Sequence, residues 1–218
     1  MKRLVIVGAG GHGRGVLEIL RARRAAGLPV PDVEGFVDDA AAGPVGGLPV
    51  LGSVAWLEAR GATFAAVLAI ASSRSKRLLF ERLAAAGVEW AGPVVHPTAV
   101  LGSGTTVAEG AIVGAGVVVA YDTRIEAHTT INLNATVGHD CRIGRFSTVA
   151  PGVNITGNVV IGEGVEVQTN ATVVPGITIG DGAHVGPGSV VLRDVAAGAA
   201  VFGNPARPHP RPARGPSQ

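Results

Sequence analysis

The chain has 218 residues, of which 47% are hydrophobic and 16% charged, and its formal net charge is +2. This composition is typical of a well-buried globular protein, and so small a net charge argues against nucleic acid or an acidic membrane as the partner. The single cysteine, Cys141, excludes an internal disulfide and a cysteine-based zinc motif, and it is consistent with a reducing compartment. Because the first apolar run, residues 4–7, is too short for a signal peptide or a membrane span, we expect a cytoplasmic protein with no membrane partner.

Residues 1–92 alternate strand-like and helix-like segments. In chain order we expect a strand at 4–7, a helix through residue 26, a strand at 33–37, a short helix from Ser53 to Arg60, a strand at 64–71, and a helix capped by Ser72 or Ser73 and closed by Gly87. This alternation predicts a small Rossmann-like α/β domain with a parallel sheet.

From Val94 onward the sequence repeats with a period of six. Every sixth residue from Val95 to Val191 is Val, Ile or Leu, and the residue four positions later is mostly small or β-branched. A helix needs a period near 3.6 and a half-buried strand a period of two. A period of six instead predicts a parallel β-helix of hexapeptide repeats with three flat faces, over residues 93–204. The unbroken phase leaves no room for a long loop, so an active site must use the surface of the coil or another subunit.

The last residues, 205–218, are rich in Pro and Arg and lack apolar periodicity. We expect them to form a flexible tail.

Residues 8–13 read GAGGHG and match G-x-G-x-x-G between an expected strand and an expected helix. Such glycines allow a tight turn and bring backbone N–H groups to an anion at the helix N-terminus. One interpretation is NAD binding, with Asp38 or Asp39 on the ribose hydroxyls. Since the residues before the repeats suffice for only one mononucleotide half, we favour a nucleotide with a group attached. The alternative is a glycine turn that only packs strand on helix.

The glycine loop, the Asp-Asp pair at 38–39, GHDCRIG at 138–144 and VFGNPAR at 201–207 occur together in this chain. In these motifs, over residues 3–207, the chain resembles the NeuD/PglD-type sugar acetyltransferases. The resemblance implies acetylation of a nucleotide-linked amino sugar or of sialic acid with acetyl-CoA, without a metal. It also implies a left-handed coil and a homotrimer with active sites between neighbouring coils.

The resemblance further implies roles for individual residues. His139 matches the general base and Asp140 the acidic residue beside it. The remaining matches are Gly10, Gly11, His12, Asp38, Asp39, Ser72 and Ser73 for the nucleotide sugar, and Asn132, Gly157 and Thr169 for acetyl-CoA. Two departures stand out: Ser72-Ser73 replaces a common [DN]-N, and Thr148 replaces a histidine found in some members.

His139 suits the chemistry because an imidazole titrates near neutral pH and can accept a proton from an attacking amine. The thioester is already activated, so no covalent enzyme intermediate is required. Neighbours on an extended strand point to opposite faces, so contact between His139 and Asp140 requires a corner of the coil. We interpret His96, His128, His184 and His209 as non-catalytic and Cys141 as a packing residue.

Several alternatives remain open at this point. Because a neutral amine is the better nucleophile, we favour N-acetylation over O-acetylation of a sugar or sialic acid. A non-catalytic sugar-nucleotide-binding protein would keep the same glycine loop. Two further classes fit less well: His128, His139 and His184 are spaced too irregularly for the three converging imidazoles of a zinc hydratase, and the second half-domain that an NAD-dependent oxidoreductase needs is absent.

Overall fold

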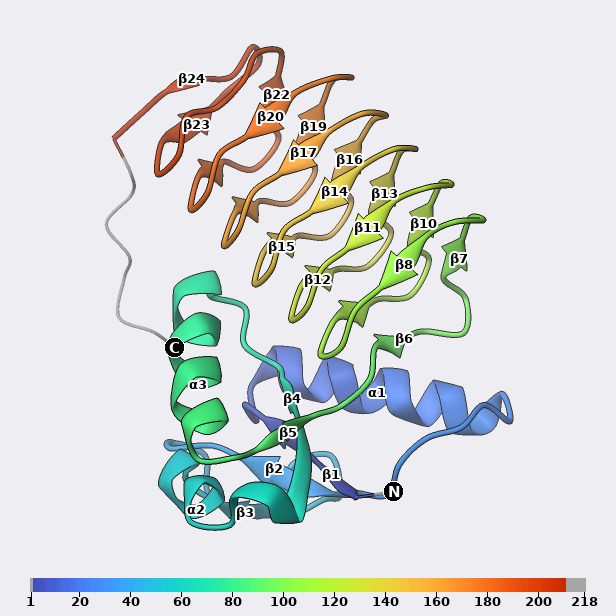
Figure 1. Cartoon of the computed structure of the whole chain (residues 1–218), viewed down its shortest axis with the longest axis vertical. Helices are drawn as coiled ribbons and strands as arrows, with labels where there is room; N and C mark the ends of the chain where they lie inside the picture. The colour runs from blue at the N-terminus through green and yellow to red at the C-terminus, as the bar shows by residue number, and fades with distance from the viewer. Residues whose placement is uncertain (1, 211–218) are drawn as a thin grey trace.

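The computed structural model describes residues 2–210, and the first part of the chain forms a three-layer α/β unit (Figure 1). Its strands are β1 (Arg3–Val7), β2 (Val33–Val37), β3 (Val50–Gly52), β4 (Phe64–Leu68) and β5 (Glu89–Trp90), all parallel in the order β3-β2-β1-β4-β5. Its helices are α1 (Gly11–Ala25), α2 (Val54–Glu58), the 3-10 helix Gly61–Thr63 and α3 (Ser73–Ala85). The expected parallel α/β sheet is confirmed, with β3 and β5 as additional strands too short to show a pattern in the sequence.

The two faces of the sheet follow from the alternation of side chains along β1. Leu4 and Ile6 pack in the cluster that includes α1, whereas Val5 and Val7 pack in the cluster that includes α2 and α3. Successive side chains on a strand point to opposite faces, so one apolar run supplies both cores. The sheet is therefore covered by α1 on one side and by α2 and α3 on the other.

The helix boundaries follow the expected signals. Ser53 caps α2 by accepting from the backbone N of Trp56, and Ser72 caps α3 by accepting from that of Ser75. Gly87, with φ +76°, follows the end of α3. Two boundaries differ from the expectation, because α2 ends at Glu58 rather than at Arg60, and β4 ends at Leu68 rather than at residue 71. The residues after it leave the sheet and turn toward α3.

The second part of the chain is a three-sided coil of short parallel strands (Figure 1). One face contains β7 (Val100–Leu101), β10 (Val118–Val119), β13 (Thr136–Val137), β16 (Asn154–Ile155), β19 (Thr172–Val173) and β22 (Val190–Val191). The next contains β8 (Thr106–Val107), β11 (Arg124–Ile125), β14 (Arg142–Ile143), β17 (Val160–Ile161) and β20 (Thr178–Ile179). The third contains β6 (Val94–Val95), β9 (Ile112–Val113), β12 (Thr130–Ile131), β15 (Thr148–Val149), β18 (Glu166–Val167), β21 (His184–Val185), β23 (Ala200–Phe202) and β24 (Arg207–Pro208).

The corners of the coil explain its repeated glycine, asparagine and aspartate residues. Every sixth residue from Gly104 to Gly188 has a positive φ, including Asp122, Asn134 and Asp140. This left-handed conformation costs least for Gly and is tolerated best by Asn and Asp among the others. The chain can therefore turn sharply after each short strand without a loop.

The aliphatic series fills the coil as expected, except at its first turn. All of its members from Val113 to Val191 are buried, but Leu101 is 37% exposed. Leu101 belongs to β7, the terminal strand of its face, so no further strand covers it. The first turn thus contributes less to the core than the sequence pattern suggested.

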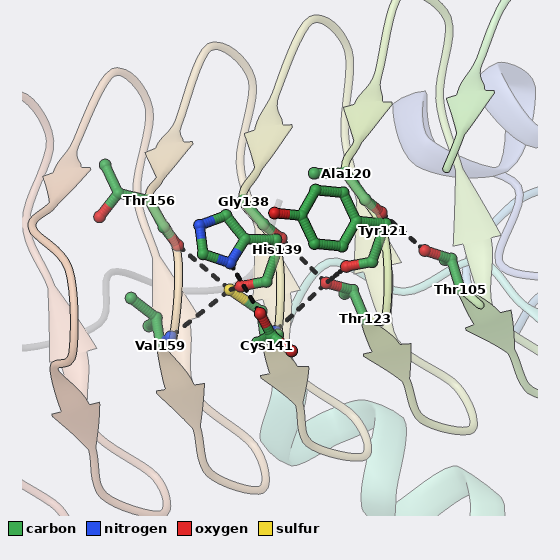
Figure 2. A network of polar contacts seen from close by, with 10 residues as sticks. Thr105, Ala120, Tyr121, Thr123, Gly138, His139, Cys141, Thr156 and Val159 are labelled. Carbon is green, nitrogen blue, oxygen red and sulfur yellow. Dashed lines mark hydrogen bonds and ion pairs between the residues drawn. The ribbon is translucent and has the colours of Figure 1, made fainter. Parts of the chain in front are cut away.

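A column of polar side chains joins successive turns along one inner corner (Figure 2). Thr105 Oγ1 donates to the carbonyl of Ala120, and Thr123 Oγ1 donates to that of Gly138. Cys141 continues the column, because its buried thiol lies 3.1 Å from the carbonyl oxygen of Thr156 and donates to it. This placement supports the interpretation of Cys141 as a packing residue.

The C-terminal end of the coil reaches beyond the boundary expected at residue 204. Phe202 and Val201 of β23 pair antiparallel with Arg207 and Pro208 of β24. The first residues of the expected tail therefore belong to a strand pair. The rest of that tail, residues 211–218, lies outside the described residues.

Candidate functional site

The glycines of the loop between β1 and α1 have two different surroundings: some are closely packed and others have free space around them. Gly8 has φ +104°, and a Cβ on Gly13 would lie 1.8 Å from the carbonyl oxygen of Gly8. These two glycines let α1 pack closely on β1. Gly10 and Gly11, by contrast, have no heavy atom within 4 Å of where a Cβ would stand. The N-terminus of α1 is therefore open, which suits an anionic ligand.

The two aspartates after β2 accept hydrogen bonds from backbone N–H groups of the surrounding segments. Asp38 accepts hydrogen bonds from the backbone N–H groups of Ala9, Ala40 and Ala41. Burial raises the pKa of Asp38, but these three N–H donors outweigh it and hold the pKa below its usual range. Asp39 Oδ1 accepts from the backbone N–H of Val54 at the start of α2, 2.7 Å away. Both carboxylates thus support the shape of the loop region next to α1.

A cavity of about 570 Å³ lies between the N-terminal part of α1 and the coil. Its lining includes Gly11, His12, Glu18, His96, Asn132 and Pro151. Asn132 Oδ1 accepts from the backbone N–H of Leu133, which leaves the Nδ2 amide as the donor of this side chain. The cavity therefore brings a residue of the glycine loop and a residue of the coil to one space of small-molecule size.

His12 is kept neutral in this cavity. Burial first, and then the positive charge of Lys76, lower its pKa from 6.5 to about 4. Its Nε2 has no hydrogen-bond partner among residues 2–210. A neutral imidazole with an unpaired nitrogen can donate to or accept from a bound sugar or phosphate.

His139 and Asp140 form a hydrogen-bonded pair on the outside of the coil. The distance from His139 Nδ1 to Asp140 Oδ2 is 2.7 Å, and 42% of the His139 side chain is exposed. Asp140 reaches its neighbour because it has φ +54° at a corner, which is the geometry that the contact required. The pair fixes Nδ1 of the imidazole, and Nε2 has no hydrogen-bond partner in the described part of the chain.

The structure brings only some of the expected site residues together. Asn132 lies at the corner between β12 and β13, whereas His139 lies at the corner between β13 and β14. These are different edges of the three-sided coil, and His139 does not line the cavity. One copy of the chain therefore separates the expected residues into two groups, one around His12 and Asn132 and the other around His139.

The remaining expected residues occupy separate positions. Gly157 lies beside the His139 ring, since a Cβ there would stand 2.6 Å from Nε2. Thr169 is exposed on the edge of the coil that also carries Asn132. Ser72 and Ser73 are not among the residues lining the cavity: Ser72 caps α3, and the buried Ser73 donates its backbone N–H to Glu166 Oε1.

Several residues near the site carried no sequence signal that we recognised. Glu18 and His96 line the cavity, and Tyr121 stacks on His139. Tyr121 precedes His139 by 18 residues, which is one turn of the coil, so the repeat itself could have revealed this contact. Glu18 and His96 lie on different units, and their proximity depends on how α1 packs against the coil.

Neither a metal site nor a membrane span is found in residues 2–210. The described residues contain no group of three or more His, Cys, Asp or Glu side chains placed to hold a metal ion. None of the helices in this range is both long enough and apolar enough to cross a bilayer.

Comparisons with known families match both parts of the chain. Residues 3–83 match the PglD N-terminal domain. Residues 134–168 match the hexapeptide repeat of succinyl-transferase, and residues 158–193 match the bacterial transferase hexapeptide of six repeats. A comparison with curated protein sequences gave no match.

Several solved structures resemble nearly the whole chain, including those of three different proteins. The acetyltransferase domain of PglB from Neisseria gonorrhoeae, in complex with acetyl coenzyme A, is 32% identical with a TM-score of 0.86 over 95% of this chain and 99% of that chain. A variant of perosamine N-acetyltransferase from Caulobacter crescentus, in complex with CoA and GDP-perosamine, is 33% identical with a TM-score of 0.86 over 96% of this chain and 98% of that chain. WeeI from Acinetobacter baumannii is 29% identical with a TM-score of 0.85 over 96% of this chain and 100% of that chain.

These similarities cover the α/β unit and the coil together, at an identity and coverage that establish common family membership. They also agree with the sequence motifs in the glycine loop and around His139. The coil is accordingly a left-handed parallel β-helix. The chain belongs to the NeuD/PglD-type family of hexapeptide-repeat sugar acetyltransferases and is an acyltransferase.

Proposed function

We propose that the protein transfers the acetyl group of acetyl-CoA to the amino group of a nucleotide-linked amino-deoxysugar, with His139 as general base. The related PglB domain is bound to acetyl coenzyme A, and the related perosamine N-acetyltransferase to CoA and GDP-perosamine. The cavity at the open N-terminus of α1 supports a nucleotide sugar as the second substrate, with Gly11 and His12 in its lining and Gly10 next to them in the glycine loop.

The His139 and Asp140 pair is the observation that carries this proposal. With Nδ1 held by Asp140 at 2.7 Å, the proton-accepting nitrogen of the neutral ring is Nε2, on a half-exposed side chain at the outer edge of the coil. Asp140 also stabilises the imidazolium that forms when Nε2 accepts a proton. This arrangement resembles the base and orienting carboxylate of many transferases and hydrolases.

The proposed reaction is a direct transfer. The sugar amine attacks the thioester carbonyl carbon, a C–N bond forms, and His139 Nε2 takes one proton from the attacking nitrogen. The tetrahedral intermediate then breaks its C–S bond, and the imidazolium returns the proton to the departing sulfur. The products are the N-acetyl sugar nucleotide and CoA. Amide donors such as Asn132 Nδ2 and backbone N–H groups at the corners are suited to the oxyanion.

We propose a homotrimer, because the two groups of expected site residues lie on different edges of one coil. A neighbouring copy would bring its His139 edge to the cavity around His12 and Asn132 and so complete the site. Gly157 and Thr169 would then lie along the groove between coils as part of the acetyl-CoA site. The free, buried thiol of Cys141 supports the cytoplasm as the proposed compartment.

Thiol release from acetyl-CoA tests the catalytic proposal. Wild-type protein should release thiol with at least one 4-amino-deoxysugar nucleotide from a panel with UDP, GDP, dTDP and CMP carriers. The His139→Ala variant should lose about 10²–10⁴-fold in kcat. His209→Asn is the matched control, since His209 is exposed near the C-terminal end of the coil. Absence of thiol release from the wild type with every acceptor would favour the non-catalytic alternative.

The product distinguishes the two types of acetylation. An N-acetyl product resists hydroxylamine, whereas an O-acetyl ester is cleaved by it. Mass spectrometry before and after hydroxylamine treatment should therefore show a stable added acetyl group. Loss of that acetyl group on hydroxylamine treatment would show that the product is an O-acetyl ester and would contradict the proposed N-acetylation.

Subunit mixing tests whether the site is shared between copies. His139→Ala and Asn132→Ala proteins should each have low activity, and hetero-oligomers formed by co-expression should recover part of it. Recovery is expected because some interfaces then combine an intact His139 with an intact Asn132. If mixing restores nothing although the oligomers form, the shared site is wrong.

A further inference from the structure

Three successive turns of the coil place Tyr121, His139 and Gly157 in one column at the same outer corner. The residues are 18 positions apart, and their strands pair in register, β10 with β13 and β13 with β16. Figure 2 shows the Tyr121 ring beside the His139 ring. Their centroids are 5.2 Å apart and their planes differ by 9°, which is a parallel stack.

Gly157 leaves the space that the imidazole needs on its other side. A Cβ at this position would stand 2.6 Å from His139 Nε2 and 2.8 Å from Cε1. Any side chain there would push the ring away. The His139 ring therefore lies between an aromatic ring on the preceding turn and a bare backbone on the following turn.

Asp140 supplies a third constraint at the edge of the same ring. Its Oδ2 lies 2.7 Å from His139 Nδ1, and its backbone N–H donates to the carbonyl oxygen of Tyr121, 3.2 Å away. One hydrogen bond at Nδ1 still permits the half-exposed ring to tilt about that contact. Stacking on Tyr121 removes this freedom, since it fixes the plane of the ring.

We infer that Tyr121 is a positioning residue, which holds the plane of the His139 imidazole so that Nε2 meets the attacking amine in one orientation. This inference rests on the proposed role of His139 as general base. Small errors in the placement of a base are costly, because proton transfer requires hydrogen-bond distance and direction. The π face of Tyr121 also attracts the imidazolium that forms during transfer.

The contact is made by the ring and not by the hydroxyl. The Tyr121 phenol has no side-chain hydrogen bond within residues 2–210, and the side chain is half exposed. Phenylalanine should therefore replace tyrosine without loss, whereas an aliphatic residue of similar size should not. This distinction separates positioning by stacking from a proton-transfer role of the phenol.

Steady-state kinetics of Tyr121→Phe and Tyr121→Leu test the inference. We expect Tyr121→Leu to lower kcat about three- to tenfold, the range that the energy of one aromatic pair supplies, with little change in KM for either substrate. Tyr121→Phe should retain wild-type kcat. Ser103→Ala is the matched control, because Ser103 occupies the same column one turn before Tyr121 and two turns before His139. Sedimentation should give the same oligomeric state for all four proteins.

Proton NMR of the same proteins detects the stacking of the Tyr121 and His139 rings independently of activity. Tyr121 is the single tyrosine of the chain, so selective labelling gives one ring to observe. The wild type should show cross-relaxation between this ring and the His139 ring, together with upfield-shifted His139 ring protons. Tyr121→Phe should keep that shift and Tyr121→Leu should lose it.

The outcomes separate this inference from the proposed function. An active wild type, an inactive His139→Ala and an unchanged kcat in Tyr121→Leu would overturn the inference and leave the proposed function intact. Equal loss of kcat in the Phe and Leu variants would also overturn it, since the hydroxyl would then be the important group. Full activity of His139→Ala would overturn the proposed function and the positioning role together.

Discussion

Lys76 Nζ of α3 donates a hydrogen bond to the carbonyl oxygen of His128 on the coil, 3.1 Å away. The hydroxyl oxygens of Thr130 and Thr148 lie at 3.3 Å from the same ammonium group. Lys76 has no exposed surface, so a charged side chain joins the α/β unit to the coil in a fully buried position. Burial lowers the pKa of Lys76 to about 7, although the charge of Glu166 acts in the opposite direction.

This buried lysine predicts a rise of stability with pH. The unfolded chain, with an ordinary lysine pKa of 10.5, binds more protons than the folded protein between about pH 7 and that value. The free energy of unfolding should therefore increase through this window. Lys76→Met should reduce the slope, because methionine carries no titrating group. Urea unfolding at several pH values measures the slope for each protein.

Lys2→Met is the matched control for this measurement, since Lys2 is the only other lysine and pairs with Glu89 at the surface. Its slope should equal that of the wild type. Identical slopes in wild type and Lys76→Met would contradict the lowered pKa of Lys76. Selective labelling of lysine follows the two side chains directly, and the Lys76 signal should titrate near pH 7.

The buried His128 predicts a loss of stability at acidic pH. Its ring is 1% exposed and packs among Phe80, Trp90 and Phe146, and neither ring nitrogen has a hydrogen-bond partner among residues 2–210. Burial first, then the charges of Arg145 and Lys76, lower its pKa from 6.5 to about 4. The unfolded chain binds the extra proton in this range, so stability should fall as pH drops from 6.5 toward 4.

Replacing His128 with phenylalanine should remove part of this acid sensitivity. The aromatic surroundings favour another aromatic ring, and no polar contact of the imidazole is lost. Thermal unfolding at pH 7 and pH 5 should show a smaller difference for His128→Phe than for the wild type. His209→Phe, at an exposed position, is the control and should behave like the wild type. If the difference between pH 7 and pH 5 were as large in His128→Phe as in the wild type, this explanation would be wrong.

The period of six made much of the fold and half of the site predictable. Alignment of residues 18 apart follows from it, and so does the corner that brings Asp140 to His139. The cap of α3 and the glycine loop could also be predicted from the sequence, because capping and close packing depend on local residues. These features need no knowledge of how the α/β unit sits on the coil.

The contacts between the two units were not predictable from local patterns. From the sequence, Lys76 is expected on the exposed face of an ordinary amphipathic helix, and Glu166 is expected to point outward from a short strand. Only the packing of α3 on the face with β12, β15 and β18 makes both of them buried. For the same reason the sequence did not place Ser73 against Glu166, where its backbone N–H donates at 3.1 Å.

Cys141 should behave as a structural residue and not as a nucleophile. Burial raises the pKa of its thiol, although the backbone N–H of Val159 acts against this, and the thiol donates to the carbonyl of Thr156. We expect slow reaction with a thiol reagent in the folded protein and rapid reaction in urea. Fast labelling under native conditions would contradict this placement.

Substitutions of Cys141 test the same point through stability. Cys141→Ser keeps a donor for the Thr156 carbonyl, as Thr123 does for Gly138 one turn earlier. Cys141→Val removes that donor and should cost about 1–3 kcal/mol in the free energy of unfolding. The serine variant should be the more stable of the two and should keep its activity. A valine variant that equals the wild type would show that the hydrogen bond contributes nothing.

The glycine loop predicts different effects on stability for substitutions of Gly10 and Gly13. Gly13→Ala would place a Cβ 1.8 Å from the carbonyl oxygen of Gly8 and 3.3 Å from the Phe36 ring, so α1 must move away from β1. Such overpacking should cost about 1–3 kcal/mol in the free energy of unfolding. Gly10 has φ −72° and free space around it, so Gly10→Ala should fold with wild-type stability.

The same pair separates folding from ligand binding. The methyl group of Gly10→Ala would stand at the open N-terminus of α1, where the proposed nucleotide sugar approaches the backbone N–H groups. Its KM for the nucleotide sugar should rise, while its KM for acetyl-CoA and its unfolding curve stay unchanged. Gly13→Ala should instead show the stability loss in urea unfolding. An unchanged KM for the nucleotide sugar in the Gly10→Ala protein would move the ligand away from this loop, because a close approach of the substrate cannot tolerate the added methyl group without loss.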